Sequence, residues 1–177
     1  EVSVFRGKII ENRHKVMSYI QNISGKTLLS TNNDTDMVFP RSSIKIFQAI
    51  PFIISNADIK FNLDDKNIAI ACASHCGEPI HLKTLNQWIK KININIKDLQ
   101  CGIHNPIDSR SSQNLLINGK KPSQLHNNCS GKHLAMISGC IANKLNYKNY
   151  LDFSHSYQSL IREILEQFTE SKIRKKG

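Results

Sequence analysis

The alternation of apolar and polar residues divides the chain into a strand-forming N-terminal part and a longer helical part. Residues 1–10 alternate β-branched and polar side chains, a pattern typical of a strand. Residues 14–23 and 26–30 flank Ser24-Gly25 and predict a β-hairpin, because glycine readily adopts the positive φ that such turns require. After residue 42, apolar residues recur at helical spacing and no strand-like run follows. The pattern predicts an α+β protein whose strands precede its helices.

Four helices can be placed from the three- and four-residue spacing of apolar side chains. They cover, in chain order, residues 42–55, a segment that begins near Glu78, residues 130–145 and residues 150–169. The side chains expected to face inward are Ile44, Phe47, Pro51, Ile54, Leu82, Leu85, Trp88, Ile89, Ile92, Leu134, Ile137, Ile141, Tyr157, Leu160, Ile161, Ile164, Leu165 and Phe168. Residues 32–34 and 101–124 are rich in turn-forming residues and are predicted to be loops.

Length and composition are those of a folded protein with one domain. The chain has 177 residues, of which 40% are hydrophobic and 21% charged. We expect a single domain over residues 1–170, followed by a disordered basic tail over residues 171–177. No apolar run approaches the roughly 18 residues that a membrane span requires. Charged residues within the first twenty positions argue against a secretory signal.

The cysteines and the net charge narrow the class of protein further. Five cysteines, an odd number at irregular spacing, favour reduced thiols in a cytoplasmic protein over a disulfide framework. The net charge of +10 is compatible with nucleic-acid binding. However, the lysines are dispersed among isoleucine and asparagine, and aromatic and basic residues do not interleave as in nucleic-acid-binding motifs. We therefore expect neither a nucleic-acid partner nor a membrane partner.

Ser42 and Lys45 form the first candidate catalytic pair. They stand three residues apart near the start of a predicted helix, shortly after Pro40, which is tolerated in a first turn. Side chains at this spacing lie on one face of a helix, so a lysine that has lost its proton could activate the serine as a nucleophile. Taken alone, the pair is better explained as a helix cap and a solvated lysine, because Ser-x-x-Lys is a frequent chance match.

Three further polar stretches lie at or just before predicted helix starts. They are residues 73–79, 101–104 and 125–133, and each places hydroxyl, imidazole or amide groups beside glycine. Glycine permits close approach of the backbone to a ligand, and the free N–H groups of a helix start can bind an anion or a developing oxyanion. Cys72, His75 and Cys76 in the first stretch could also hold a metal, although their spacing suits a helix interior equally well.

Taken in order, these stretches resemble the bacterial asparaginases related to the thermolabile asparaginase II of rhizobia. The matching residues are Arg6-Gly7, Glu11 and His14, Arg41 to Lys45 with Gln48-Ala49, Ala73 to His75 with Gly77-Glu78, and Asn127 to His133. The resemblance extends from residue 1 to about residue 155. The Thr-Gly-Gly-Thr signature of the classical asparaginases does not occur.

The resemblance implies an α+β fold of the β-lactamase/transpeptidase type and an L-asparaginase activity. Ser42 would attack the carboxamide of L-asparagine while Lys45 accepts its proton; ammonia would leave, and water would release L-aspartate from the acyl-enzyme. Ser74 matches a second active-site serine, and Arg41 and His133 match residues that lie near the substrate. Which serine is acylated, and whether asparagine or glutamine is preferred, stay open. The resemblance is compatible with a homodimer.

The resemblance also implies a zinc site to which Cys129 and Lys132 contribute two ligands. A lysine ligand must be neutral to donate its lone pair, and without the resemblance the pair would be read as a buried thiol and a surface lysine. The family's third ligand is a cysteine beyond the last predicted helix, but no cysteine follows Cys140. Cys140 itself would lie about 16 Å from Cys129 along a helix. The expected zinc site is therefore incomplete.

Other departures suggest a shortened member of the family. The C-terminal strands of the family fold, and the late lysine that pairs with the second serine, have no counterpart, and residues 171–177 show neither periodicity nor resemblance. Cys76 stands where a serine is usual. These features predict a C-terminally truncated asparaginase, with a catalytically inactive remnant as the alternative. A penicillin-recognising enzyme of the same fold is disfavoured, because such enzymes act outside the cytoplasm.

Overall fold

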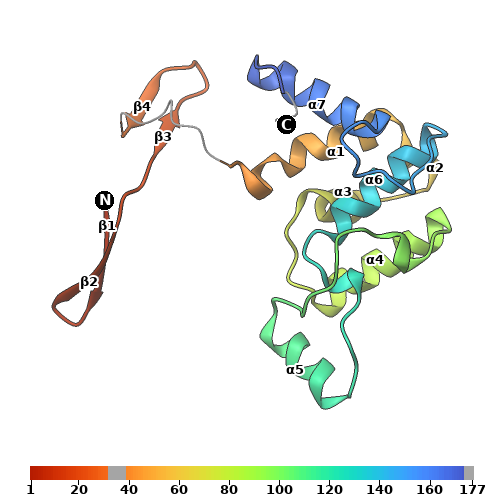
Figure 1. Cartoon of the computed structure of the whole chain (residues 1–177), viewed down its shortest axis with the longest axis horizontal. Coiled ribbons are helices and arrows are strands. Elements are labelled where there is room, and N and C mark those ends of the chain that lie inside the picture. Colours follow the sequence, from red (N-terminus) through yellow and green to blue (C-terminus); the bar gives the residue numbers. More distant parts are fainter. Residues whose placement is uncertain (32–38, 174–177) are drawn as a thin grey trace. The chain divides into compact units, whose positions relative to one another are not determined.

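The computed structural model describes residues 1–31 and 39–173 and contains two compact units, residues 1–40 and 41–177 (Figure 1). The first is built from antiparallel strands and the second from helices, so the chain is an α+β protein. The loop predicted at residues 32–34 and residues 174–177 of the predicted tail lie outside the described residues. In the described part, no helix is both long and apolar enough to cross a membrane.

The N-terminal unit consists of two hairpins. β1 (Val2–Arg6) pairs antiparallel with β2 (Ile9–His14), and β3 (Tyr19–Gln21) pairs antiparallel with β4 (Thr27–Ser30). The prediction of one strand over residues 1–10 is wrong, because Gly7 adopts a φ of +64° and turns the chain between β1 and β2. The hairpin predicted around Ser24-Gly25 is confirmed, with shorter strands than expected.

No core forms within this unit. Among described residues 1–31, none is buried, and large apolar side chains such as Phe5 and Ile9 are 59% and 75% exposed. A two-stranded hairpin is at best marginally stable on its own in water, since most of its side chains lose little contact with solvent. The buried apolar side chains of the described residues therefore all lie in the helical unit.

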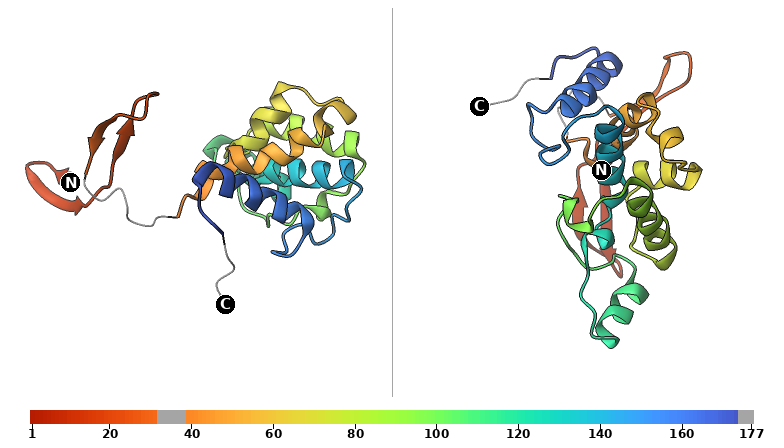
Figure 2. Two further views of the ribbon diagram at one scale, coloured as in Figure 1. Left: turned by 90° about the horizontal axis from the view of Figure 1, so that it is seen from above. Right: turned by 90° about the vertical axis from the view of Figure 1, so that its right-hand side faces the viewer.

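The helical unit is organised around its central helix, α6, in Figures 1 and 2. The elements of this unit are the 3-10 turn η1 (Arg41–Ile44), α1 (Lys45–Ile54), α2 (Ala57–Lys60), α3 (Asp65–Cys72), α4 (Pro79–Ile92), η2 (Ile96–Asp98), α5 (Ser109–Ile117), η3 (Gln124–His126), α6 (Ser130–Ala142) and α7 (Ser156–Thr169). Helices α1, α2, α3, α4 and α7 all contact α6, which is buried along most of its length.

Side-chain caps determine where several helices begin. The Asp64 carboxylate accepts hydrogen bonds from the backbone N–H groups at positions 66 and 67, and the Asn67 side chain returns a bond to the backbone of Asp64. Asp108 accepts from Ser111 N–H at 2.7 Å and starts α5 within the predicted loop 101–124. That loop prediction is wrong for α5, because a helix with no buried residue carries no apolar periodicity to detect. In Figures 1 and 2, α5 lies at the edge of the unit, opposite α7.

The core lies where α1, α4 and α7 pack onto α6. Phe52 and Trp88 pack with ring centroids 5.5 Å apart, and the Trp88 indole N–H donates to Ser138 Oγ at 2.9 Å. The residues of the four predicted helical faces that are buried are Pro51, Leu85, Trp88, Ile92, Leu134, Ile137, Tyr157, Ile161 and Ile164. The prediction for α7 was wrong at Leu160 and Phe168, which are 37% and 64% exposed.

The buried face of α1 differs from the predicted one. Lys45, Ala49, Pro51 and Phe52 face inward, whereas Ile54, expected to be buried, is 68% exposed. Nearly every position of α1 is apolar, so the sequence pattern does not define a single face. The helix consequently buries a lysine and leaves an isoleucine in solvent.

Replacing Tyr157 by phenylalanine is expected to raise the free energy of unfolding by about 1 kcal/mol. The Tyr157 hydroxyl is buried without a hydrogen-bond partner among the described residues, and an unsatisfied buried polar group is destabilising. Tyr150 is the matched control, because its hydroxyl accepts from Gln100 N–H and is bonded to His133 Nδ1. Tyr150→Phe should therefore lower the free energy of unfolding by about 1–3 kcal/mol in urea titrations. Equal losses in both variants would contradict this account.

Candidate active site

Three of the residues predicted to be catalytic meet at the junction of η1, α1 and the end of α3. The Lys45 ammonium nitrogen Nζ donates to the Ala73 carbonyl at 2.7 Å and to Ser74 Oγ at 2.7 Å. Ser74 Oγ in turn donates to Ser42 Oγ at 3.1 Å. The three side chains therefore form one hydrogen-bonded row, in which Ser74 lies between the lysine and Ser42.

The row runs from the protein interior to solvent. Lys45 is 2% exposed, whereas Ser42 and Ser74 are both exposed. Among the described residues, no carboxylate forms an ion pair with Lys45. A buried amine that contacts a hydroxyl and a carbonyl, but no acid, is an arrangement suited to receiving a proton from the hydroxyl.

The turn that precedes Ser42 has an uncommon backbone conformation. Arg41 adopts a φ of +47°, which is costly for a residue with a Cβ atom and is found most often at functional turns. The Arg41 side chain is exposed, and among residues 1–31 and 39–173 no hydrogen bond or ion pair joins it to Ser42 or Ser74. The predicted substrate contact of Arg41 therefore stays a prediction.

His133, predicted to contact substrate, lies inside α6 and is only 5% exposed. Its Nδ1 atom and the Tyr150 hydroxyl share a hydrogen bond of 2.6 Å. Burial, together with the nearby charges of Lys132 and Lys45, lowers the pKa of His133 to about 3, so the imidazole is neutral at pH 7. His133 therefore lies near the Lys45 end of the row, but it reaches solvent hardly at all.

His75, which follows Ser74, anchors the serine-bearing segment to α6. Its Nε2 atom is 2.8 Å from Ser130 Oγ, and its Nδ1 atom accepts a hydrogen bond from the Gly77 N–H at 3.1 Å. Gly77 has a φ of +79°, and a Cβ atom there would lie 3.0 Å from Pro106, so the turn requires glycine. Burial lowers the pKa of His75 to about 4, with smaller effects from nearby basic groups. The sequence pattern alone does not predict this positioning role of His75, although its place directly after Ser74 indicates that it lies near the candidate site.

The predicted metal ligands lie at the start of α6. Cys129 precedes the first residue of the helix and Lys132 follows three positions later, so both can face one side of the first turn. Burial lowers the pKa of Lys132, which favours the neutral amine that a metal requires. In the ranges that the structure describes, no three His, Cys, Asp or Glu side chains gather closely enough to hold a metal ion. The suggestion of a metal site at Cys72, His75 and Cys76 is therefore wrong.

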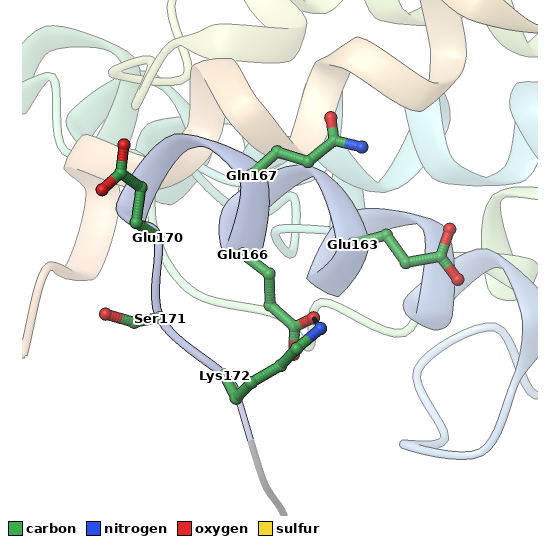
Figure 3. A pocket seen from close by; sticks show the side chains of 6 residues that line it. All are labelled: Glu163, Glu166, Gln167, Glu170, Ser171 and Lys172. Atoms are coloured by element: carbon green, nitrogen blue, oxygen red, sulfur yellow. Dashed lines mark hydrogen bonds and ion pairs between the residues drawn. The ribbon is translucent and has the colours of Figure 1, made fainter.

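A separate surface hollow of about 390 Å³ lies at the C-terminal end of α7 (Figure 3). Its lining is acidic and includes Glu163, Glu166 and Glu170. The Lys172 ammonium group forms an ion pair with Glu166 at 2.7 Å within this lining (Figure 3). None of the residues predicted to be catalytic or metal-binding lines it.

The chain matches a known protein family. A family model described as L-asparaginase II matches residues 2–176. The match continues past residue 155. The expectation that residues 171–177 do not resemble the family is therefore wrong for residues 171–176. No curated protein sequence matches the chain.

Proposed function

Because the chain belongs to the L-asparaginase II family, we propose that it hydrolyses L-asparagine to L-aspartate and ammonia through a serine acyl-enzyme. The observation that supports this proposal most directly is the hydrogen-bonded row formed by Lys45, Ser74 and Ser42. It supplies a nucleophilic hydroxyl that faces solvent, a buried base and a hydroxyl between them that can carry a proton.

In the first step, Ser42 Oγ attacks the carboxamide carbon of asparagine. The proton of Ser42 then passes to Ser74 Oγ while the proton of Ser74 passes to Lys45 Nζ. This transfer requires the two hydrogen bonds of the row to run from Ser42 to Ser74 and from Ser74 to Lys45, the reverse of the donor directions in the structure. The same row returns a proton to the leaving nitrogen, the C–N bond breaks, and ammonia departs. Water then attacks the ester, loses a proton to Lys45, and releases aspartate with the Ser42 hydroxyl restored.

Ser74 is the alternative nucleophile. It contacts the Lys45 amine directly at 2.7 Å, whereas Ser42 reaches the amine only through Ser74. We favour Ser42 as the acylated residue because Ser74 between two partners is better suited to transfer a proton. A fold of the β-lactamase type is part of the proposal, since a Ser-x-x-Lys sequence at the beginning of a buried helix agrees with it.

Zinc is the cofactor that we propose, with Cys129 and Lys132 as two of its donors. When bound, Zn²⁺ would supply a structural cross-link, because sites built from thiolates without a substrate-facing position serve mainly to hold segments together. The residues of the reaction itself, Ser42, Ser74 and Lys45, act without it in the steps given above.

The test is ammonia release from L-asparagine by the purified chain. Ser42→Ala should lower kcat by about 10³-fold or more, because removal of an acylated serine removes the covalent route. Ser171→Ala is the control, since Ser171 is also exposed and its hydroxyl donates to the Thr169 carbonyl after α7, and it should retain the wild-type rate. L-Glutamine as a second substrate determines which amide is preferred.

The position of the acyl group distinguishes the two serines. Acid quenching during turnover, followed by peptide mass spectrometry, should locate an aspartyl ester on Ser42, and an ester on Ser74 would reverse their roles. A folded wild-type chain that releases no ammonia from either amide would contradict the proposed activity and favour the inactive remnant.

A further inference from the structure

His104 lies at the end of the turn-rich stretch 101–104, and its imidazole is hydrogen-bonded through both nitrogen atoms. Its Nδ1 atom is 2.6 Å from the Asn105 carbonyl oxygen. Because a carbonyl can only accept, Nδ1 carries the proton and donates it, and Nε2 keeps a lone pair. The Asn128 N–H donates to that lone pair at 3.1 Å. Asn128 Oδ1 also lies 3.5 Å from Nε2, but two acceptors form no hydrogen bond. The ring is therefore an acceptor for one backbone N–H just before the start of α6.

A single residue connects His104 to the candidate active site. The Asn128 carbonyl accepts a hydrogen bond from the His75 N–H at 3.3 Å. Asn128 is thus held at its N–H by the imidazole of His104, and it holds His75 at its carbonyl. His75 directly follows Ser74, the middle residue of the hydrogen-bonded row. Two hydrogen bonds therefore link the His104 ring to the backbone beside Ser74.

Both peptide groups that contain the Ser74 Cα atom are held by hydrogen bonds. A peptide group is planar and includes the Cα atoms of the two residues that it joins. In the group before Ser74, the Ala73 carbonyl accepts from Lys45 Nζ at 2.7 Å. In the group after it, the His75 N–H donates to Asn128. The two bonds together fix the Ser74 Cα atom and so restrict the direction of its Oγ atom.

The loop that carries His104 is fastened by contacts that do not involve the imidazole. At one end, the Asn127 side chain donates to the Cys101 carbonyl at 2.6 Å. At the other, the Asp108 N–H donates to the Cys76 carbonyl at 2.9 Å. Loss of the imidazole lone pair should therefore leave the loop in place and release only the backbone N–H that the ring accepts.

We propose that His104 is a positioning residue for Ser74 and acts on it through Asn128 and the His75 N–H. The lone pair of the ring holds the Asn128 peptide group, which keeps the Ser74 hydroxyl aligned in the hydrogen-bonded row. The effect concerns the proton-transfer path, so it changes the rate of the chemical step and not the binding of substrate. This inference rests on the proposed function, in which Ser74 carries protons between the nucleophile and the base.

Two amide substitutions that differ by one methylene group test the proposal. A glutamine Oε1 atom can take the place of Nε2 and accept the Asn128 N–H, whereas the shorter side chain of asparagine does not reach it. His104→Asn should lower kcat for L-asparagine at least about ten-fold and leave KM nearly unchanged, because small misplacements of catalytic groups are costly. His104→Gln should recover most of the wild-type kcat, whereas a loss of imidazole packing alone would lower kcat equally in both variants.

Amide exchange is a second readout that does not require activity. In heteronuclear NMR spectra, the His75 amide should exchange with deuterium at least about ten-fold faster in His104→Asn than in the wild type or in His104→Gln. A wild-type chain that hydrolyses no asparagine would contradict the proposed function, and amide exchange would still decide whether His104 holds the backbone beside Ser74.

Two outcomes would overturn the positioning role. The first is wild-type exchange of the His75 amide in His104→Asn, and the second is an equal loss of kcat in His104→Asn and His104→Gln. If His104→Asn does not fold, as judged by circular dichroism, the wild-type chain is measured instead. An NMR coupling across the hydrogen bond should then join the Asn128 backbone nitrogen to His104 Nε2, and its absence would refute the contact.

Discussion

Gly131→Ala is expected to lower the free energy of unfolding by about 3 kcal/mol, although alanine is the better helix former. Gly131 lies in the first turn of α6, where a Cβ atom would be 2.2 Å from the Ile70 carbonyl oxygen and 2.7 Å from its carbon. Both atoms belong to the backbone of α3, so no side chain can move aside, and the two helices must separate. Alanine in place of glycine would otherwise stabilise a helix interior by about 1 kcal/mol.

The same substitution should reduce catalysis. Ile70 is three residues before Ala73, whose carbonyl accepts the hydrogen bond of Lys45, and Ser74 follows directly. Displacement of α3 from α6 therefore moves Ser74 relative to Lys45. Urea unfolding and ammonia release measure the two effects. Gly119→Ala is the control: Gly119 has a φ of +60° but no atom within 4 Å of its Cβ position, so about 1 kcal/mol should be lost and activity kept. Wild-type stability of Gly131→Ala would show that α3 and α6 tolerate a wider spacing.

Acidification is expected to remove about 3 kcal/mol of stability through His75 alone. Burial lowers the pKa of this imidazole from 6.5 to about 4, so between these values the unfolded chain binds a proton that the folded chain does not. The contribution of His75 is thus fully present above pH 6.5 and is lost as the pH falls toward 4. Protonation would also remove the acceptor that Nδ1 offers to the Gly77 N–H.

Urea titrations at several pH values between 7 and 4 measure this dependence. His75→Gln keeps a donor and an acceptor at the position but cannot titrate, so its free energy of unfolding should change less with pH than that of the wild type. His14→Gln, at an exposed position of β2, should leave the dependence unchanged. Equal pH dependence in His75→Gln and the wild type would show that other groups dominate acid unfolding.

Local spacing was sufficient to predict that two residues of the candidate site lie near each other. Ser42 and Lys45 are one helical turn apart, and the structure places both in the same hydrogen-bonded row. Spacing could not show that Ser74 lies between them, because that contact depends on how α3 packs against α1. The sequence also could not show that Lys45 faces the protein interior, because an apolar helix such as α1 has several faces of similar hydrophobicity.

Helices and strands could likewise be predicted where they depend on neighbouring residues, but not where they depend on contacts between distant parts of the chain. The helix start near Glu78 follows from capping groups within a few residues of sequence, and it can be predicted for that reason. The interruption of the first predicted strand at Gly7 depends on pairing between β1 and β2, which alternation alone does not specify.

The central place of α6 also has a consequence for synthesis of the chain on the ribosome. Helices α1, α3 and α4 bury their apolar faces against a helix that is translated after all three. Until residue 142 has left the exit tunnel, these helices lack the surface that stabilises them, and their apolar residues stay accessible to chaperones. Ser42, Lys45 and Ser74 of the candidate site are thus synthesised early in the helical unit, but they acquire their geometry only after α6 has been synthesised.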